Sequence, residues 1–143
     1  MRWWDTSALL PLLLRQEVTD QLRALLASDD GLVVWWGTKI EAVSAVSRLE
    51  RNGQLDSSVT SQLLKQLDRL LSAVYEVQPL EEVRTTACRA LRVHELRAAD
   101  ALQLAAALVW AGHSPAGLGF VCLDRRLREA AMREGFEVLP ESS

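Results

Sequence analysis

Short apolar segments alternate with longer amphipathic segments along almost all of this 143-residue chain. The clearest short segment, Leu32–Trp36, is a continuous apolar run typical of a buried parallel strand. The longer segments repeat apolar residues at helical spacing. Strands separated by helical crossovers predict an α/β fold, a parallel sheet with helices on both faces. We expect strands at Arg2–Trp4, Leu32–Trp36, Ala73–Val77, Gly119–Leu123 and Glu137–Leu139. We expect helices at Thr6–Leu14, Glu17–Ser28, Thr38–Asn52, Ser57–Leu71, Leu80–Leu91, Arg97–Ala111 and Arg125–Glu134.

Length and composition indicate one domain over residues 1–143. Hydrophobic residues make up 49% of the chain and charged residues 24%, which is ordinary for a globular protein. No apolar run approaches the roughly 18 residues of a membrane span, so we expect a cytoplasmic protein without a membrane partner. We also expect buried thiols at Cys88 and Cys122. The net charge of -3 argues against a protein that coats nucleic acid by bulk charge, but it does not exclude a nuclease.

Polar residues follow three of the expected strands, at the edge where open parallel sheets form their sites. Asp5, Thr6 and Ser7 follow the first strand, Glu41 comes shortly after the second, and Asp124 follows the fourth. We expect the first and fourth strands to be neighbours at the centre of the sheet. The sequence therefore predicts that acidic side chains gather at one edge.

Helix capping is the alternative explanation for these three acids. Asp5 and Asp124 each precede a helix, and Asp is a good N-cap, although the two hydroxyl residues after Asp5 also cap well. Glu41 ends a Thr38-x-x-Glu capping box. Both explanations stay open for each of these residues.

Asp100 is a fourth acid, near the start of the helix expected at Arg97–Ala111. That helix is apolar nearly all round, so we expect it to be buried. An ion pair with Arg97, one turn back, is the ordinary explanation for such an acid. A carboxylate among Ala and Leu also suits a ligand of a cation.

Four carboxylates directed at one place repel one another, and a divalent cation removes this conflict. Oxygen ligands without nearby His or Cys point to Mg²⁺ or Mn²⁺, ions that polarise a phosphoryl oxygen and activate water. Arg125 and Arg126 begin the helix after Asp124, where the helix dipole favours an anion such as phosphate. A solvated arginine face is the alternative explanation for this pair.

Four motifs follow one another along the chain: Asp5-Thr6-Ser7-Ala8-Leu9, Glu41, Leu96-Arg97-Ala98-Ala99-Asp100-Ala101-Leu102 and Cys122-Leu123-Asp124-Arg125-Arg126-Leu127. Taken together and in this order, they resemble the motifs of the PIN-domain family, and the length and motif sequences are similar to those of the VapC-type toxins of toxin–antitoxin pairs. The resemblance covers essentially the whole chain. It implies a PIN-like three-layer α/β/α fold with a central five-stranded parallel sheet, dependence on Mg²⁺ or Mn²⁺, and cleavage of single-stranded or structured RNA. It also implies a homodimer and a VapB-like antitoxin partner.

The resemblance also implies roles for individual residues. The catalytic and metal-binding acids are Asp5, Glu41, Asp100 and Asp124, and the hydroxyl pair Thr6 and Ser7 supports them. Our hypothesis places one Mg²⁺ on the three Asp side chains, while Glu41 helps to hold a second ion or orients the attacking water. The same hypothesis assigns the flanking phosphates to Arg125, Arg126 and Arg48. Arg48 lies seven residues after Glu41, and an ordinary solvated arginine is the alternative explanation for it.

Two positions depart from the family pattern. Cys122 stands where Thr or Ser is frequent, and Gln103 stands where His is frequent. Neither change removes a carboxylate. The alternative function is a degenerate PIN-like module that binds RNA or an antitoxin without cutting, and the retention of all four acids argues against it.

Overall fold

Five parallel strands form a single sheet in the computed structural model, which describes residues 1–141. The last two residues of the domain expected over 1–143, Ser142 and Ser143, lie outside the described residues. The strand order is β3-β2-β1-β4-β5, which places β1 at the centre, paired with β2 and β4. The strands are β1 (Arg2–Trp4), β2 (Leu32–Trp35), β3 (Tyr75–Val77), β4 (Gly119–Val121) and β5 (Glu137–Leu139).

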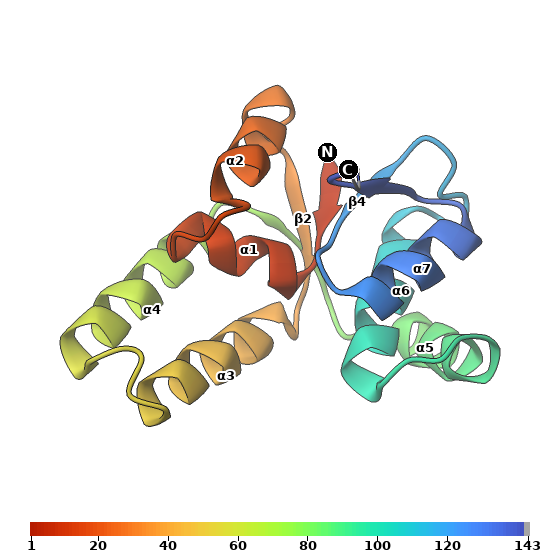
Figure 1. Ribbon diagram of the computed structural model, residues 1–143. Helices are drawn as coiled ribbons and strands as arrows, with labels where there is room; N and C mark the ends of the chain where they lie inside the picture. Colours follow the sequence, from red (N-terminus) through yellow and green to blue (C-terminus); the bar gives the residue numbers. More distant parts are fainter. Residues whose placement is uncertain (142–143) are drawn as a thin grey trace.

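Helices lie on both sides of the sheet (Figure 1). One side carries α1 (Thr6–Leu13), α2 (Thr19–Ser28), α3 (Thr38–Arg51) and α4 (Ser57–Leu71). The other side carries α5 (Glu81–Val93), α6 (Ala98–Trp110) and α7 (Arg125–Glu134). The expected three-layer α/β/α fold with a five-stranded parallel sheet is therefore confirmed. Among residues 1–141, no helix is both long and apolar enough to span a membrane.

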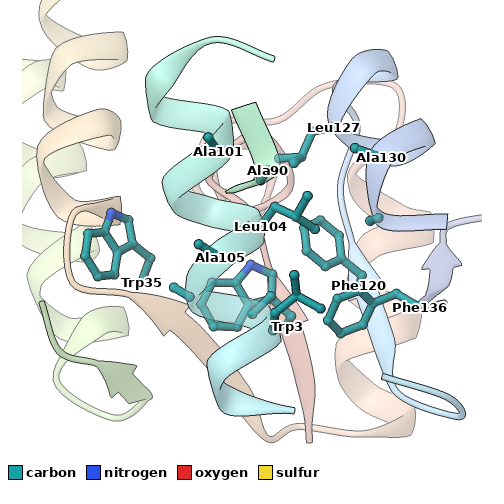
Figure 2. Packing of buried hydrophobic residues seen from close by; sticks show 14 of the residues in the cluster. Trp3, Trp35, Ala90, Ala101, Leu104, Ala105, Phe120, Leu127, Ala130 and Phe136 are labelled. Atoms are coloured by element: carbon teal, nitrogen blue, oxygen red, sulfur yellow. The ribbon is translucent and has the colours of Figure 1, made fainter. Parts of the chain in front are cut away.

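The central strand divides its two tryptophans between two hydrophobic cores, because successive side chains of a strand point to opposite faces. Trp3 is fully buried against α6 and against Phe120 of β4, and Figure 2 shows these rings beside Leu104 and Ala105. Trp4 is equally buried on the other face, among side chains of α1 and α2. The small residues of α6 leave room for the large rings beneath that helix.

Some element ends and exposures differ from the expectations. The third strand begins at Tyr75 because Ala73 lies in the turn that follows α4, where its N–H donates to the carbonyl of Leu70. Trp36 lies just past β2 and is 45% exposed, so it is not a core residue. Cys122 is a buried free thiol as expected, but Cys88 is exposed because it lies on the outer side of α5.

Candidate functional site

The four acids of the sequence analysis meet at the carboxyl ends of the three central strands. Asp5 follows β1, Glu41 lies in the first turn of α3 after β2, and Asp124 follows β4. The chain leaves β1 toward β2 on one side and returns to β4 on the other, and such reversals of strand order are where open sheets bind ligands. Together with Asp100 of α6, these residues line one pocket of about 420 Å³, which we call the acid pocket. Its other lining residues are Thr6, Ser7, Ile40, Ser44, Ala45 and Arg48.

Asp5 is itself the N-cap of α1, so it is Asp5, and neither of the two hydroxyl residues that could also cap, that begins this helix. Its Oδ2 accepts hydrogen bonds from the backbone N–H of Ser7 (3.2 Å), from Ser7 Oγ (2.6 Å) and from Cys122 Sγ (3.5 Å). Capping occupies only this one oxygen, and it does not keep Asp5 out of the acid pocket. Burial raises the pKa of Asp5, although the bonds from Ser7 and Cys122 oppose the shift.

The capping box proposed for Glu41 does not form. Gly37 is the N-cap of α3, Thr38 is its first residue, and Thr38 is fully buried. Glu41 instead makes long-range contacts, because its Oε2 accepts hydrogen bonds from Thr6 Oγ1 (3.0 Å) and from Gln103 Nε2 (2.9 Å). Burial, and then the charges of other acids in the pocket, raise the pKa of Glu41 to about 6 despite these two bonds.

Asp100 and Asp124 complete the acidic lining. Asp100 is half-buried in the first turn of α6, and no ion pair with Arg97 forms within residues 1–141. Burial raises the pKa of Asp100, and the charges of Asp124 and Asp5 raise it further. Asp124 is exposed and caps α7, since its Oδ1 accepts a hydrogen bond of 3.0 Å from the N–H of Leu127. Asp124 therefore serves both as a cap and as part of the pocket.

Three of these carboxylates share a pattern, in which one oxygen is held by the protein and the other is not. Asp5 Oδ1, Glu41 Oε1 and Asp124 Oδ2 accept no hydrogen bond from residues 1–141. Mutual repulsion together with these open oxygens matches the chemistry of a site for a hard divalent cation. As placed, no group of three His, Cys, Asp or Glu side chains within residues 1–141 is arranged to hold a metal ion. The donor set thus fits Mg²⁺ or Mn²⁺ in kind, although the carboxylates would have to move closer together to hold such an ion.

A second pocket of about 690 Å³ adjoins the acid pocket and shares Asp100 and Asp124 with it. We call it the arginine pocket because Arg97, Arg125 and Arg126 line it, along with Glu95, Ala99 and Glu129. Arginines thus lie on both sides of the acids, since Arg48 lines the acid pocket itself.

These arginines differ in how far other side chains already hold them. Arg126 lies 3.8 Å from Glu95. Within residues 1–141, Arg48, Arg97 and Arg125 form no ion pair. Arg128, which follows Arg125 and Arg126 on α7, does not line either pocket and instead donates to the carbonyls of Cys122 and Pro140.

Cys122 and Gln103, the two residues that differ from the PIN-domain motifs, both contact acids of the pocket. Burial, and then the charge of Asp5, raise the pKa of the Cys122 thiol far above its usual range, so the thiol stays protonated and donates to Asp5. Gln103 is fully buried and donates to Glu41. Sequence reasoning treated Gln103 only as a departure and Arg97 only as an ion-pair partner. One signal was present for Gln103, a lone amide three residues after Asp100 in an otherwise apolar helix.

Comparisons with known proteins support the fold. No protein-family model matches the chain, and no curated protein matches it. A chain of the toxin–antitoxin complex from Klebsiella pneumoniae is similar, with a TM-score of 0.61, 16% identity and coverage of 87% of each chain. The protein PAE2754 from Pyrobaculum aerophilum is also similar, with a TM-score of 0.63, 25% identity and coverage of 96% of this chain and 88% of that one. The arrangement of helices and strands described above therefore also occurs in a toxin–antitoxin complex.

Proposed function

We propose that this protein is a metal-dependent endoribonuclease, the toxin of a type II toxin–antitoxin pair of the VapC kind, and that it cleaves single-stranded or structured RNA. The observation that carries the proposal is that four carboxylates line one pocket at the reversal point of the sheet. Three of them present an oxygen that no hydrogen bond from residues 1–141 occupies. The fold likeness to a chain of a toxin–antitoxin complex supports the same assignment.

Asp5, Asp100 and Asp124 would hold one Mg²⁺ or Mn²⁺, and Glu41 would help with a second ion or orient water. When bound, such an ion supplies Lewis acidity toward a phosphoryl oxygen and lowers the pKa of water. Ser7 holds one oxygen of Asp5 in place through two hydrogen bonds, and the other oxygen would be the one that contacts the ion. Hydrogen bonds of this kind set the orientation of a carboxylate that serves as a metal ligand.

The arginines would hold the RNA backbone on either side of the acids. Arg48 lies in the acid pocket, while Arg97, Arg125 and Arg126 line the arginine pocket next to it. Guanidinium groups suit the two oxygens of a phosphate. In hydrolysis, a water oxygen bonds to phosphorus, one P–O ester bond breaks, and a proton passes to the leaving oxygen. One RNA fragment then ends in a phosphate and the other in a hydroxyl.

An antitoxin partner, a homodimer and a cytoplasmic location belong to the same proposal. Exposed apolar side chains supply a surface for a protein partner, because Trp36 is 45% exposed and Ile40 is 62% exposed. Both line a groove that also includes Leu71 of α4. Ile40 also lines the acid pocket, so a protein bound in this groove would lie close to the acids.

The competing proposal is a PIN-like module that binds RNA or an antitoxin without cutting. The observation that favours it is the absence, within the described part of the chain, of three potential metal ligands already arranged around one point. A nuclease requires the carboxylates to close on a cation, whereas a binding module does not. Metal binding therefore separates the two proposals.

The test is cleavage of labelled single-stranded RNAs and hairpins by purified protein in Mg²⁺, Mn²⁺ or EDTA, with Asp100→Asn beside the wild type. Cutting that needs the metal and is lost in the variant supports the nuclease. Undiminished metal-dependent cutting by Asp100→Asn refutes the assignment of the acids. If neither protein cuts and Mn²⁺ does not raise the melting temperature of the wild type, the binding module is the better account.

A further inference from the structure

We infer that Gln103 is a positioning residue, which holds the carboxylate of Glu41 in the acid pocket in an orientation set by Trp3. The inference rests on the function proposed for that pocket and adds a residue to it. Gln103 lies on α6, three residues after Asp100, and none of its surface is exposed. It joins the central strand to the acid on α3 through its side chain alone.

The indole of Trp3 decides which way the Gln103 amide faces. Trp3 Nε1 lies 3.2 Å from Gln103 Oε1, and an indole N–H can only donate a hydrogen bond. The partner of that N–H must therefore be the amide oxygen. Since Trp3 is itself fully buried, this end of the glutamine is held within the hydrophobic core.

The opposite end of the amide consequently presents its two N–H protons to Glu41 and to the hydroxyls of Thr38 and Thr6. Gln103 Nε2 lies 2.9 Å from Glu41 Oε2, 2.9 Å from Thr38 Oγ1 and 3.2 Å from Thr6 Oγ1. Thr6 Oγ1 in turn donates to Glu41 Oε2. Oε2 thus has two donors, and Oε1 is the oxygen left for a cation or a water. This division of the two oxygens is the positioning effect.

A purely structural role for Gln103 makes a different prediction. The amide would then serve only to satisfy the buried Trp3 and Thr38, and Glu41 would be an incidental neighbour. Removing the amide would loosen the core to the same extent whether or not Glu41 carries a carboxylate. The two roles differ in the coupling between Gln103 and Glu41, which a double-mutant cycle measures.

The experiment measures Mn²⁺ affinity by isothermal titration calorimetry for the wild type, Gln103→Met, Glu41→Gln and the double variant. We expect Gln103→Met to weaken Mn²⁺ binding about tenfold in the wild-type background. In the Glu41→Gln background, the same substitution should weaken Mn²⁺ binding by less than a further twofold. The control is Leu104→Met, which alters the core at the next residue of α6 without removing a hydrogen bond, and its affinity should stay within twofold of the wild type. An equal loss from Gln103→Met in both backgrounds would overturn the inference.

A second measurement needs neither metal nor activity, and it covers a Gln103→Met protein that fails to fold. The ¹H–¹⁵N spectrum of the metal-free wild type should show the Gln103 side-chain amide with slow solvent exchange. Glu41→Gln should shift this resonance and speed its exchange severalfold. An unchanged resonance would contradict the positioning role even if Mn²⁺ binds. Absence of Mn²⁺ binding with a shifted resonance would instead reject the proposed nuclease and keep the positioning contact.

Discussion

The hydroxyl of Thr6 donates a 3.0 Å hydrogen bond to Oε2 of Glu41, although the two residues are 35 positions apart in the chain. Thr6 is the first residue of α1 after β1, and Glu41 lies in the first turn of α3 after β2. Those two strands are paired at the centre of the sheet. The sheet therefore brings the beginnings of α1 and α3 close together, and the hydrogen bond between them fixes one oxygen of Glu41 in the acid pocket.

Replacing Thr6 by Val removes this donor while keeping the shape of the side chain. The hydrogen bond favours the ionised form of Glu41, so its loss should raise the pKa of Glu41 above the present value of about 6. We expect a rise of roughly half a unit to one unit, measured by ¹³C NMR titration of the Glu41 carboxyl carbon in the metal-free protein. An unchanged titration in Thr6→Val would show that this contact does not hold the carboxylate.

Thr60 serves as a comparison for Thr6, whose hydroxyl is hydrogen-bonded to Glu41. The buried hydroxyl of Thr60 has no hydrogen-bond partner within residues 1–141. A buried polar group without a partner is destabilising. Thr60→Val should therefore raise the free energy of unfolding by about 1 kcal/mol, measured by urea denaturation, and leave Mn²⁺ affinity as it is. A loss of stability would mean that the hydroxyl has a partner after all.

The raised pKa of Glu41 predicts how metal-free stability depends on pH. Because the folded pKa of about 6 lies above the ordinary value of 4.5, the folded state binds more protons between these two pH values. The free energy of unfolding therefore falls as the pH rises through this range. Glu41→Gln removes the titrating group. As the pH rises to about 6.5, the free energy of unfolding of the variant should therefore increase relative to that of the wild type, by about 1 kcal/mol after allowing for the partial exposure of Glu41. Urea denaturation of both proteins at several pH values measures this change. A difference in the free energy of unfolding that stays constant with pH would contradict the raised pKa of Glu41.

The arginine pocket predicts where RNA binds. Arg97→Ala and Arg125→Ala, each in an Asp100→Asn background with EDTA, should weaken binding of a fluorescent single-stranded RNA. The slope of log affinity against log salt should fall by about one for each. Arg69→Ala is the control, since Arg69 is exposed on α4 and lines neither pocket. Fluorescence anisotropy measures all three, and equal effects from the control would place the RNA elsewhere.

Much of the fold followed from local pattern. The alternation of apolar strands with helices is a local property, so the parallel sheet and its two layers of helices could be predicted, as could the neighbouring positions of β1 and β4. Exposure was harder where it depends on helical phase. Cys88 lies on α5 between the buried Ala87 and Ala90, and only the packing of that helix decides that the thiol faces outward.

The contacts within the site could not be predicted in the same way. All four acids line the pocket expected for them. Their hydrogen-bond partners could not be predicted from the sequence. Whether a side chain bonds to a nearby helix terminus or to a distant donor depends on which residues the assembled sheet brings next to it. Glu41 illustrates this, since a capping box was available at Thr38, yet its partners are Thr6 and Gln103. The second of these is 62 residues away.

Direct measurement of Mn²⁺ binding tests the central claim that the acid pocket is a metal site. Calorimetric titrations would compare the wild type with Asp5→Asn, Glu41→Gln, Asp100→Asn and Asp124→Asn. The matched controls are Glu95→Gln and Glu129→Gln, which remove acids that line the arginine pocket but not the acid pocket. We predict that each acid-pocket variant weakens binding at least tenfold and that the controls stay within twofold. Equal affinities across all seven proteins, or no binding by the wild type, would contradict the account.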